Sequence, residues 1–365
     1  MSLDKRILKE IILWQQSFIP GIQLQERYIN IEPGGNYVFV GLRRAGKTYM
    51  LYQHIRQLLR QGHDIREILF INFEDERITD MRKEDLHLVI DAYRELFAYE
   101  PIIFLDEIQN IEGWEHFARR LADEGRNVFI TGSKAHMLSR EIASTLGGRF
   151  LIREIWPFTF TEYLQFQGVM LKEHWSLSPQ KADVVRLLSD YFYFGGLSES
   201  FRFADKRLWL TSLYQKVLYF DIITRKSIRN ERSISLLIRK LADSVMQPMA
   251  MKRLQNILQG DGTKINRSTI GTYISYLEEA FLCFSIPNFT DTIPLRETVR
   301  KHYFYDNGIL NLFLIQPETK LLENLVAISL FHHHGERLYY YNYGVEVDFY
   351  IPDEQLGIQV SYSIA

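Results

Sequence analysis

Apolar residues in the first 150 positions form short continuous runs that alternate with helically spaced stripes. Residues 4–18 have the helical spacing and predict an amphipathic helix. Continuous apolar runs predict strands at residues 33–41, 66–75, 101–109 and 127–133. Amphipathic stripes predict helices between them at residues 48–62, 86–99 and 114–125. Strands that are apolar throughout are typical of a parallel sheet with helices on both faces, so an α/β fold is expected.

The pattern changes near residue 150, and later elements are mainly helical. A turn is expected at the Gly-Gly pair of YFYFGGLSES, and residues 233–287 predict three helices followed by a strand. That order is the layout of a winged helix-turn-helix. Strand patterns return from about residue 303. The expected domains are therefore an α/β domain, a helical lid or linker, a winged helix-turn-helix and a small α/β domain, at residues 1–155, 156–225, 226–300 and 301–365.

The segment GLRRAGKT, residues 41–48, lies between a predicted strand and a predicted helix, which is the context of a Walker A phosphate loop. Glycines let backbone amides converge on a phosphate, and the helix N-terminus adds positive potential. Lys47 is expected to reach the β- and γ-phosphates of ATP, and the Thr48 hydroxyl to coordinate Mg²⁺. The residues expected to contact the nucleotide are Gly41, Arg44, Ala45, Gly46, Lys47, Thr48 and Tyr49.

Polar residues also end the other predicted strands, at the edge where ligands bind in parallel sheets. Asp106 ends the run IIFLD, as a Walker B aspartate does, and is expected to hold Mg²⁺. Glu107 follows and could deprotonate the attacking water, although an acid favoured by a helix N-terminus is the alternative. Ser133 could sense the γ-phosphate or cap the strand end. Together these residues predict hydrolysis rather than binding alone.

Arg149, in LGGRF, lies sixteen residues after Ser133 and beyond a predicted helix. An arginine placed there can complete the site of a neighbouring subunit, and such residues accelerate phosphoryl transfer by about 10³–10⁵-fold. A surface arginine without that role is the equal alternative. A homo-oligomer is thus one assembly that the sequence allows.

Composition and charge argue against some classes of protein but indicate no particular activity. The chain has 365 residues, 46% hydrophobic and 24% charged, with a formal net charge of −2, so the whole chain gives no signal for nucleic acid or membrane binding. No segment reaches 18 apolar residues, and the N-terminus lacks a signal sequence, so a cytoplasmic location is expected. The one cysteine, Cys283, lies in an apolar run and is expected to be buried and inert.

Several motifs, in order, resemble one known group. GLRRAGKT, FLDEIQ, TGSKAHMLS, LGGRF and WPFTFTEY resemble the prokaryotic AAA-type ATPases of the archaeal-ATPase-like group. YFYFGGLSES, FYDNGILNLF, LLENLVA and VEVDFYI resemble the C-terminal uncharacterised domain of that group. The resemblance implies an ATPase core, a winged-helix module and a terminal domain similar to PD-(D/E)xK nucleases.

The nuclease signature of that terminal domain is incomplete. Such a site needs carboxylates that converge on Mg²⁺ and a lysine near the water. Glu323 and Asp348 have suitable places, but Gln359 and Ser361 stand where an acid and a lysine would be expected. We therefore expect the fold without this chemistry, and a fold that is unfinished at Ala365. The run His332–His334 is expected to be a solvated loop rather than a metal site, because consecutive side chains point in different directions.

Binding of duplex DNA by the winged helix has thin support in the sequence. Residues 221–300 carry 12 Lys and Arg against 8 Asp and Glu, a net charge of +4. Lys and Arg contacts to phosphates supply most of the affinity for DNA. The predicted recognition helix offers Arg267, Thr269, Thr272, Tyr273 and Tyr276. The chain is thus expected to be a Mg²⁺-dependent ATPase whose nucleotide state controls its C-terminal half. The alternatives are a DNA-directed machine and a slow switch that acts on protein partners.

Overall fold

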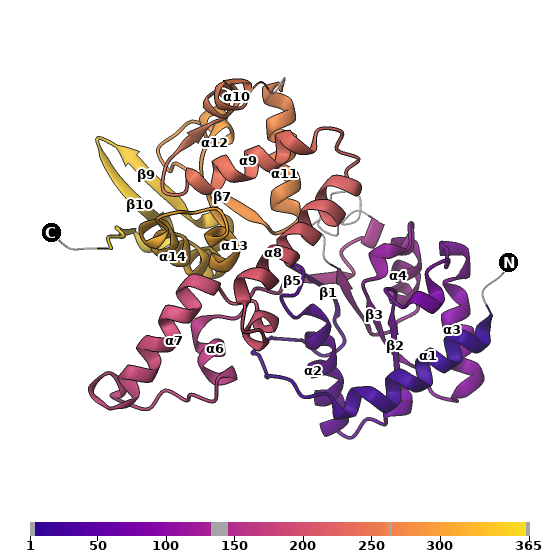
Figure 1. Cartoon of the computed structure of the whole chain (residues 1–365). Helices are drawn as coiled ribbons and strands as arrows, with labels where there is room; N and C mark the ends of the chain where they lie inside the picture. Colours follow the sequence, from indigo (N-terminus) through magenta and orange to yellow (C-terminus); the bar gives the residue numbers. More distant parts are fainter. Residues whose placement is uncertain (1–3, 133–144, 261, 263–264, 363–365) are drawn as a thin grey trace. The chain divides into compact units, whose positions relative to one another are not determined.

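The chain divides into two compact units, Met1–Ile155 and Trp156–Ala365, in the computed structural model (Figure 1). The structure describes residues 4–132, 145–260, 262 and 265–362. Each unit is treated by itself below.

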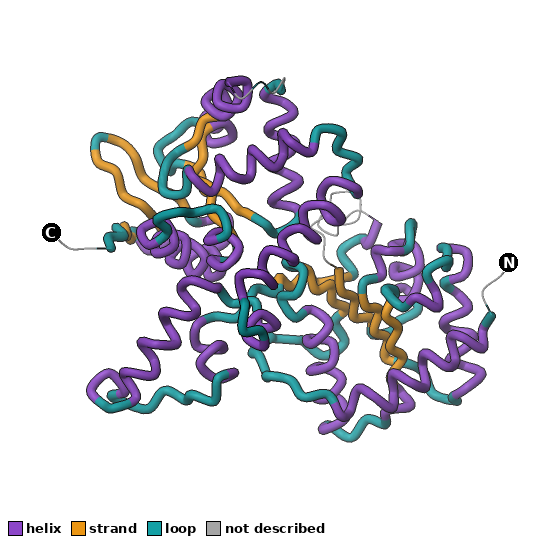
Figure 2. Tube along the Cα trace, in the orientation of Figure 1, coloured by secondary structure: helices purple, strands orange, loops and turns teal. Residues whose placement is uncertain are grey.

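The first unit is built on a five-stranded sheet. Its strands are β1 (Asn36–Val40), β2 (Ile68–Asn72), β3 (Ile102–Asp106), β4 (Val128–Gly132) and β5 (Phe150–Glu154). Its helices are α1 (Lys5–Phe18), α2 (Lys47–Arg60), α3 (His87–Leu96) and α4 (Trp114–Asp123). The strand order is β2-β3-β4-β1-β5, and every pairing is parallel. Figure 2 shows these strands side by side with helices around them. The expected α/β fold of the P-loop type is confirmed.

The core of this unit explains the apolar runs. Val38, Phe39, Ile103 and Ile130 are fully buried, as the central strands of a covered parallel sheet must be. The helix α2 packs on the sheet through His54, whose ring centroid lies 4.4 Å from that of Phe129 on β4. Burial lowers the pKa of His54, so this imidazole belongs to the core as a neutral ring.

The edge strand β5 was absent from the sequence-based prediction. It pairs with β1 alone, from Phe150 opposite Asn36 to Glu154 opposite Val40. Leu151 is exposed, and Arg153 and Glu154 interrupt the apolar pattern. Because an edge strand is covered less completely than a central one, the apolar run that marks the central strands does not form here.

The second unit is mainly helical and carries two small sheets. Its helices are α6 (Phe160–Phe166), α7 (Gln180–Phe194), α8 (Lys206–Lys216), a π-helix η9 (Val217–Thr224), α9 (Glu231–Asp243), α10 (Met251–Gly260), α11 (Arg267–Glu279), α12 (Ile293–Thr298), α13 (Asn307–Asn311) and α14 (Glu318–His334). Its strands are β6 (Met249–Ala250), β7 (Cys283–Pro287), β8 (Val299–Phe304), β9 (Tyr339–Tyr343), β10 (Val345–Ile351) and β11 (Leu356–Ile358). The strand orders are β6-β8-β7 and β11-β10-β9, with antiparallel pairings in both sheets.

The motifs YFYFGGLSES and FYDNGILNLF contact each other in the core of the second unit. Gly195 ends α7 at φ +74°, and a Cβ there would lie 2.2 Å from a carboxylate oxygen of Asp306. Asp306 accepts the backbone N–H of Gly196 at 2.8 Å and caps α13 through the N–H of Ile309. Burial raises the pKa of Asp306 to about 6, while these backbone donors oppose the shift. A residue with a Cβ at position 195 would therefore collide with the Asp306 carboxylate.

One local prediction in this unit was wrong. His332, His333 and His334 lie in the last turn of α14, not in a loop. The helix continues because no residue before Gly335 breaks it, and Gly335 then takes a positive φ as its C-cap. Among the described residues no group of three or more His, Cys, Asp or Glu side chains could hold a metal ion. Helices long and apolar enough to cross a membrane are also absent from the part of the chain that is described.

Candidate nucleotide-binding site

The loop between β1 and α2 has the backbone that a phosphate site requires. Gly41 takes φ +149°, and a Cβ there would lie 2.2 Å from the carbonyl oxygen of Ile155, so only glycine fits. Gly46 takes φ +99° as the N-cap of α2 and has open space around it. Arg44 also has a positive φ, at 67°. This conformation turns the chain sharply before the positive end of the α2 dipole.

Lys47 is held at the centre of this loop. Its side chain is buried, and its Nζ donates hydrogen bonds to the carbonyl oxygens of Gly41 and Leu42, each at 3.2 Å. A carboxylate oxygen of Glu107 lies 4.0 Å from the same Nζ. An arriving phosphate could replace the two neutral carbonyls with a stronger, charge-assisted contact to Lys47.

Thr48 and Asp106 meet across α2 and β3, as the Walker pattern predicts. The Thr48 hydroxyl lies 3.1 Å from both carboxylate oxygens of Asp106. The Thr131 hydroxyl of β4 donates to the same carboxylate. Because β1, β3 and β4 run parallel, their carboxyl ends bring these three groups to one edge of the sheet.

Thr131 is a site residue to which the sequence reasoning gave no role. Its hydroxyl oxygen also accepts the backbone N–H of Glu107, at 2.9 Å. One buried side chain thus positions both acids of the pair. Threonine at a strand end is common, and only the pairing of β3 with β4 shows that this one faces Asp106.

The electrostatics of Asp106 are unusual for an aspartate. Its side chain is 1% exposed, and burial, reinforced by the adjacent Glu107, raises its pKa to about 7. Hydrogen bonds from Thr131 and Thr48 and the charge of Lys47 oppose the shift. A cation placed at this carboxylate would favour its ionised form.

Glu107 is oriented by backbone and side chain together. It has a positive φ of 53°, which is uncommon for a non-glycine residue and turns the chain at the end of β3. The side-chain amide of Gln109 donates to its carboxylate. The residue begins the short 3₁₀ helix Ile108–Asn110, but its side chain makes no cap hydrogen bond there. Glu107 thus stands at the N-terminus of a short helix, and its alternative role as an acid favoured by the helix dipole stays open.

The other residues expected to contact the nucleotide differ in their exposure to solvent. Arg44 and Tyr49 are exposed, whereas Ala45 is buried. The carbonyl oxygen of Ala45 accepts a hydrogen bond from the guanidinium of Arg27, at 3.3 Å. Arg27 lies in the segment between α1 and β1, and its backbone also pairs with the Gln53 amide on α2. The sequence carries no local signal for this contact, because the segment has no regular structure.

One predicted site residue, Arg149, is not brought to this edge. Arg149 precedes β5, at the amino ends of the strands, and its guanidinium pairs with the carboxylate of Asp123 at the end of α4. It is thus remote from the phosphate loop of its own chain. Ser133 lies outside the described residues.

Comparison with known proteins agrees with this geometry. Residues 35–164 match the family model described as an AAA domain, and residues 185–320 match a domain of unknown function, DUF8612. The chain is 35% identical to the uncharacterized protein MJ1544 of Methanocaldococcus jannaschii, over 99% of this chain and 83% of that protein. The chain belongs to the family of MJ1544.

Other members and structures extend the comparison. An uncharacterized protein of Haemophilus influenzae is 30% identical over 90% of this chain and 82% of its own length. The Walker-type ATPase PABY2304 of Pyrococcus abyssi is 13% identical, with a TM-score of 0.47, covering 86% of this chain and 96% of that chain. The AAA match supports ATPase activity at the level of the family, although the matched relatives are uncharacterised.

The residues present fit a magnesium ion. Mg²⁺ keeps several waters and takes one or two protein oxygens beside the phosphates of its substrate. The Thr48 hydroxyl and the Asp106 carboxylate are the two oxygen donors that converge here. Burial is the main reason for the raised pKa of Asp106, and a divalent ion at this carboxylate would add to the charge of Lys47, which already opposes the shift.

The second unit has a buried cluster of its own, around Lys301. Its Nζ lies 3.2 Å from Asp348, 3.4 Å from Glu346 and 3.7 Å from Glu323, and the lysine is fully buried. Tyr303 donates to Glu323 at 2.7 Å, and the Gln359 amide donates to Asp348 at 2.6 Å. The structure thus brings together Glu323, Asp348 and Gln359, which the sequence placed in one domain. Lys301, which lies among them, was not anticipated.

Proposed function

We propose that this chain binds ATP and hydrolyses it with Mg²⁺, and that the state of the nucleotide controls its second unit. The observation that carries the proposal is the convergence of Lys47, Thr48, Asp106 and Glu107 at one sheet edge. The AAA match over residues 35–164 supports the same conclusion. Gly41, Gly46 and the α2 N-terminus provide the phosphate cradle.

Each side chain has a separate role. Lys47 exchanges the carbonyls of Gly41 and Leu42 for the β- and γ-phosphate oxygens of ATP. Glu107 then accepts the proton of the attacking water while Gln109 fixes its orientation. Mg²⁺, held by Thr48 and Asp106, supplies charge stabilisation for the developing phosphate oxygens.

Two further roles complete the proposal. Ser133, which follows β4, would contact the γ-phosphate as a sensor. Arg149 would act on the site of a neighbouring copy, and its side chain, paired with Asp123, is a third exposed. Loss of turnover in Arg149→Ala, restored when this variant is mixed with Lys47→Ala, is the expected outcome. Without rescue in the mixture, this arrangement loses its support.

Glu107→Gln separates hydrolysis from binding. The amide keeps the shape of the side chain but cannot accept a proton, so turnover should fall by about 10²–10⁴-fold while ATP still binds. Phosphate release and binding of a fluorescent ATP analogue are measured on the same preparations. Glu112→Gln, an exposed carboxylate in the loop beyond Glu107, is the matched control. Equal turnover in wild type and Glu107→Gln would remove Glu107 from the mechanism.

Duplex DNA is a second candidate ligand, carried by the topology of residues 231–304. The order α9-β6-α10-α11-β7-α12-β8, with a three-stranded antiparallel sheet, supports the interpretation as a winged helix-turn-helix. In this reading α11 is the recognition helix. Arg267, Ser268, Thr272 and Ser275 are exposed on it, whereas Tyr273 is buried and is not available for contacts. Tyr276 is covered in part by Lys226, whose Nζ lies 4.5 Å from the ring centroid.

Salt dependence tests the DNA proposal. Binding through Lys and Arg should weaken steeply with salt, and Arg267→Ala should reduce the slope of log K against log salt by about one. Absence of binding at 50 mM salt would leave a protein partner as the target of the second unit.

For the terminal domain we propose a nuclease-like fold without its chemistry. The Lys301 ammonium lies among Glu323, Glu346 and Asp348, where a nuclease would place a divalent ion. The amide of Gln359 satisfies Asp348 and supplies no charge. No Mg²⁺- or Mn²⁺-dependent cleavage of DNA is therefore expected, and cleavage that Asp348→Asn abolishes would contradict this.

A further inference from the structure

A groove of about 930 Å³ lies wholly within the second unit, between α8, the end of α9 and the segment that joins α13 to α14. We call it the basic groove. The residues that line it lie between Arg207 and Lys320, so it falls inside the stretch that matches the domain of unknown function. Ligand-binding sites usually have about 300–1,000 Å³, and the basic groove is therefore large enough for one. It shares no residue with the nucleotide site or the Lys301 cluster.

The basic groove has an excess of positive charge. Arg207 comes from α8, Arg239 from α9 and Lys320 from α14, and Asp243 is the one acid that lines it. Three positive charges against one negative charge leave a net charge of +2. The whole chain has a formal net charge of −2, so this positive surface does not follow from the overall composition. It therefore favours an anionic ligand.

Two of the three cations have neutral partners. The Arg207 guanidinium donates hydrogen bonds to the carbonyl oxygens of Asn311 and Leu312 at the end of α13, each at 3.3 Å. The Lys320 ammonium donates to the carbonyl oxygen of Asp243, the last residue of α9, at 2.6 Å. Within the described part of the chain neither cation has a carboxylate partner. Both can therefore form a stronger, charge-assisted contact with an arriving carboxylate.

Arg239 is the most available of the three cations. It is exposed, and among the residues that the structure describes it forms no hydrogen bond or ion pair, although Asp243 lies one turn further along α9. Burial raises the pKa of the nearby Tyr214 to about 12, and the charge of Arg239 opposes this shift. The phenol is therefore protonated at neutral pH. A guanidinium and a phenol hydroxyl can thus donate to the same acidic ligand.

One side of the basic groove is apolar. The run Leu312–Ile315 lines it, and the ring of Phe313 meets that of Tyr214 edge-on, with centroids 5.0 Å apart. Ile315 is 98% exposed. A single exposed isoleucine is ordinary on a protein surface, but this one extends the apolar side of a charged groove. Apolar patches rimmed by polar residues are typical of surfaces that bind other proteins.

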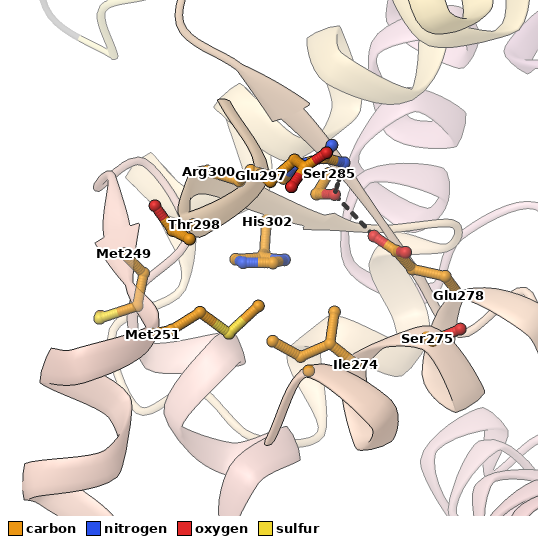
Figure 3. A pocket seen from close by; sticks show the side chains of 11 residues that line it. Met249, Met251, Ile274, Ser275, Glu278, Ser285, Glu297, Thr298, Arg300 and His302 are labelled. Atoms are coloured by element: carbon orange, nitrogen blue, oxygen red, sulfur yellow. Dashed lines mark hydrogen bonds between the residues drawn. The ribbon is translucent and has the colours of Figure 1, made fainter. Parts of the chain in front are cut away.

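A smaller cavity of the same unit shows the opposite arrangement. It has about 120 Å³ and surrounds His302 (Figure 3). The Arg300 guanidinium donates to Ser285, and Ser285 donates to Glu278, as the dashed lines in Figure 3 show. These charged groups already satisfy one another, whereas the cations of the basic groove have no carboxylate to neutralise them among the described residues.

We propose that the basic groove binds an acidic segment of a partner protein, with carboxylates on its three cations and a large apolar side chain against Leu314 and Ile315. The cations come from three different helices, so they suit negative charges that are spaced along a chain. The apolar side disfavours nucleic acid, because interfaces with nucleic acid are more polar than those between proteins. The proposal is independent of ATP hydrolysis, since every residue of the groove lies in the second unit.

Fluorescence anisotropy with labelled peptides tests this proposal on the full chain. The probe Glu-Glu-Leu-Glu-Glu-Leu-Glu-Glu should bind at low salt and weaken as salt rises. One matched peptide has Gln in place of every Glu, and another has Ser in place of each Leu. Each should bind at least about tenfold more weakly, because one lacks the charges and the other lacks the apolar side chains.

Arg239→Glu is the decisive variant, because the side chain is exposed and its replacement removes no contact within the described residues. One lost ion pair and one new repulsion should weaken binding of the probe by about three- to thirtyfold. Arg232→Glu, an exposed position on the same helix outside the groove, makes the same change of charge and should bind as wild type does. Ile315→Ser should weaken binding by up to about tenfold. Binding of an ATP analogue should be equal in all of these proteins.

A photoreactive leucine in the probe gives the location independently. Its cross-links should lie within residues 207–215 or 312–320, the two stretches that form most of the groove. Absence of binding at low salt, or equal binding by wild type and Arg239→Glu, would overturn the proposal. Cross-links confined to other parts of the chain would also overturn it. Binding of duplex DNA that Arg239→Glu weakens, without binding of the peptide, would assign the groove to nucleic acid instead.

Discussion

Among the described residues each compact unit has one buried lysine, and the two lysines have opposite kinds of partners. Lys47 contacts two neutral carbonyls at 3.2 Å and one carboxylate at 4.0 Å. Lys301 lies within 4 Å of three carboxylates and is fully buried. A charge with weak partners can be recruited by an arriving anion, whereas a charge surrounded by counter-charges cannot. Lys47 can therefore exchange its carbonyl partners for a phosphate, whereas Lys301 stays paired with its carboxylates.

The neighbouring acids show the same contrast. Asp106 accepts hydrogen bonds from two hydroxyls, and burial raises its pKa to about 7 although the charge of Lys47 opposes the shift. Asp348 has the Lys301 ammonium, an amide and the backbone N–H of Val360 as partners. In the proposed function the first acid binds Mg²⁺, whereas the second has the Lys301 ammonium as its cation.

Lys47→Ala should have the largest effect on ATP turnover. Removing the phosphate-binding charge should lower ATP turnover by at least about 10²–10³-fold, as loss of one preorganised donor does in other enzymes. The free energy of unfolding should change less than turnover does, because the two carbonyls that accept from Lys47 are neutral. Phosphate release and urea denaturation measure the two effects. A Lys47→Ala protein with undiminished turnover would refute the site.

Lys301→Met should behave in the reverse way. Its removal leaves buried carboxylates without a counter-charge, which costs about 3–5 kcal/mol of stability. Nucleotide binding by the first unit should survive wherever the protein remains folded. Urea denaturation and ATP-analogue binding test this, with Lys172→Met, a lysine in an exposed loop, as the control. An unchanged unfolding midpoint would show that the cluster does not stabilise the second unit.

Asp106→Asn tests the contrast between the two acids through the pH dependence of stability. The folded pKa is raised, so the stability it contributes is complete below about pH 4 and is lost as pH rises through about 7. Relative to wild type, Asp106→Asn should therefore gain stability as pH rises between these values, on the order of 3–4 kcal/mol. Unfolding midpoints at pH 4 to 8, without Mg²⁺, measure this. A difference that does not vary with pH would mean that Asp106 titrates normally.

Arg27→Ala is the smallest expected effect. The guanidinium supports the phosphate loop through one hydrogen bond to the carbonyl of Ala45, worth about 0.5–1.5 kcal/mol. ATP affinity should fall by up to about tenfold while turnover at saturating ATP is retained. Titration of a fluorescent ATP analogue measures this, and Arg60→Ala, on the exposed end of α2, is the control. A change in turnover alone would place Arg27 in the chemical step.

Local signals explain which parts of this structure were predictable. The spacing Gly41–Thr48 and the run ending at Asp106 lie within single strand-to-helix junctions, so short windows reveal them. Thr131 and Arg27 reach the site from segments distant in sequence, and no local pattern reports such contacts. The edge strand β5 lacks the buried run of its neighbours.

The second unit was harder to read for the same reason. Lys301 meets Glu323 and Asp348 through the packing of β8, α14 and β10. Charged residues in a sequence are expected at the surface, and only the fold shows that this lysine is enclosed. His332–His334 were assigned to a loop because their polarity hid the continuation of α14. Tyr273 was counted among surface contacts, but helical periodicity places it beside Ile270 and Ile274 in the core.

The most direct test of the central claim is phosphate release from ATP by the full chain, with Mg²⁺ and with excess chelator, in wild type and Lys47→Ala. Wild type should release phosphate only with Mg²⁺, and Lys47→Ala should release none above background. Equal release by the two proteins, or release that persists in chelator, would contradict the assignment of this site to Mg²⁺-dependent ATP hydrolysis.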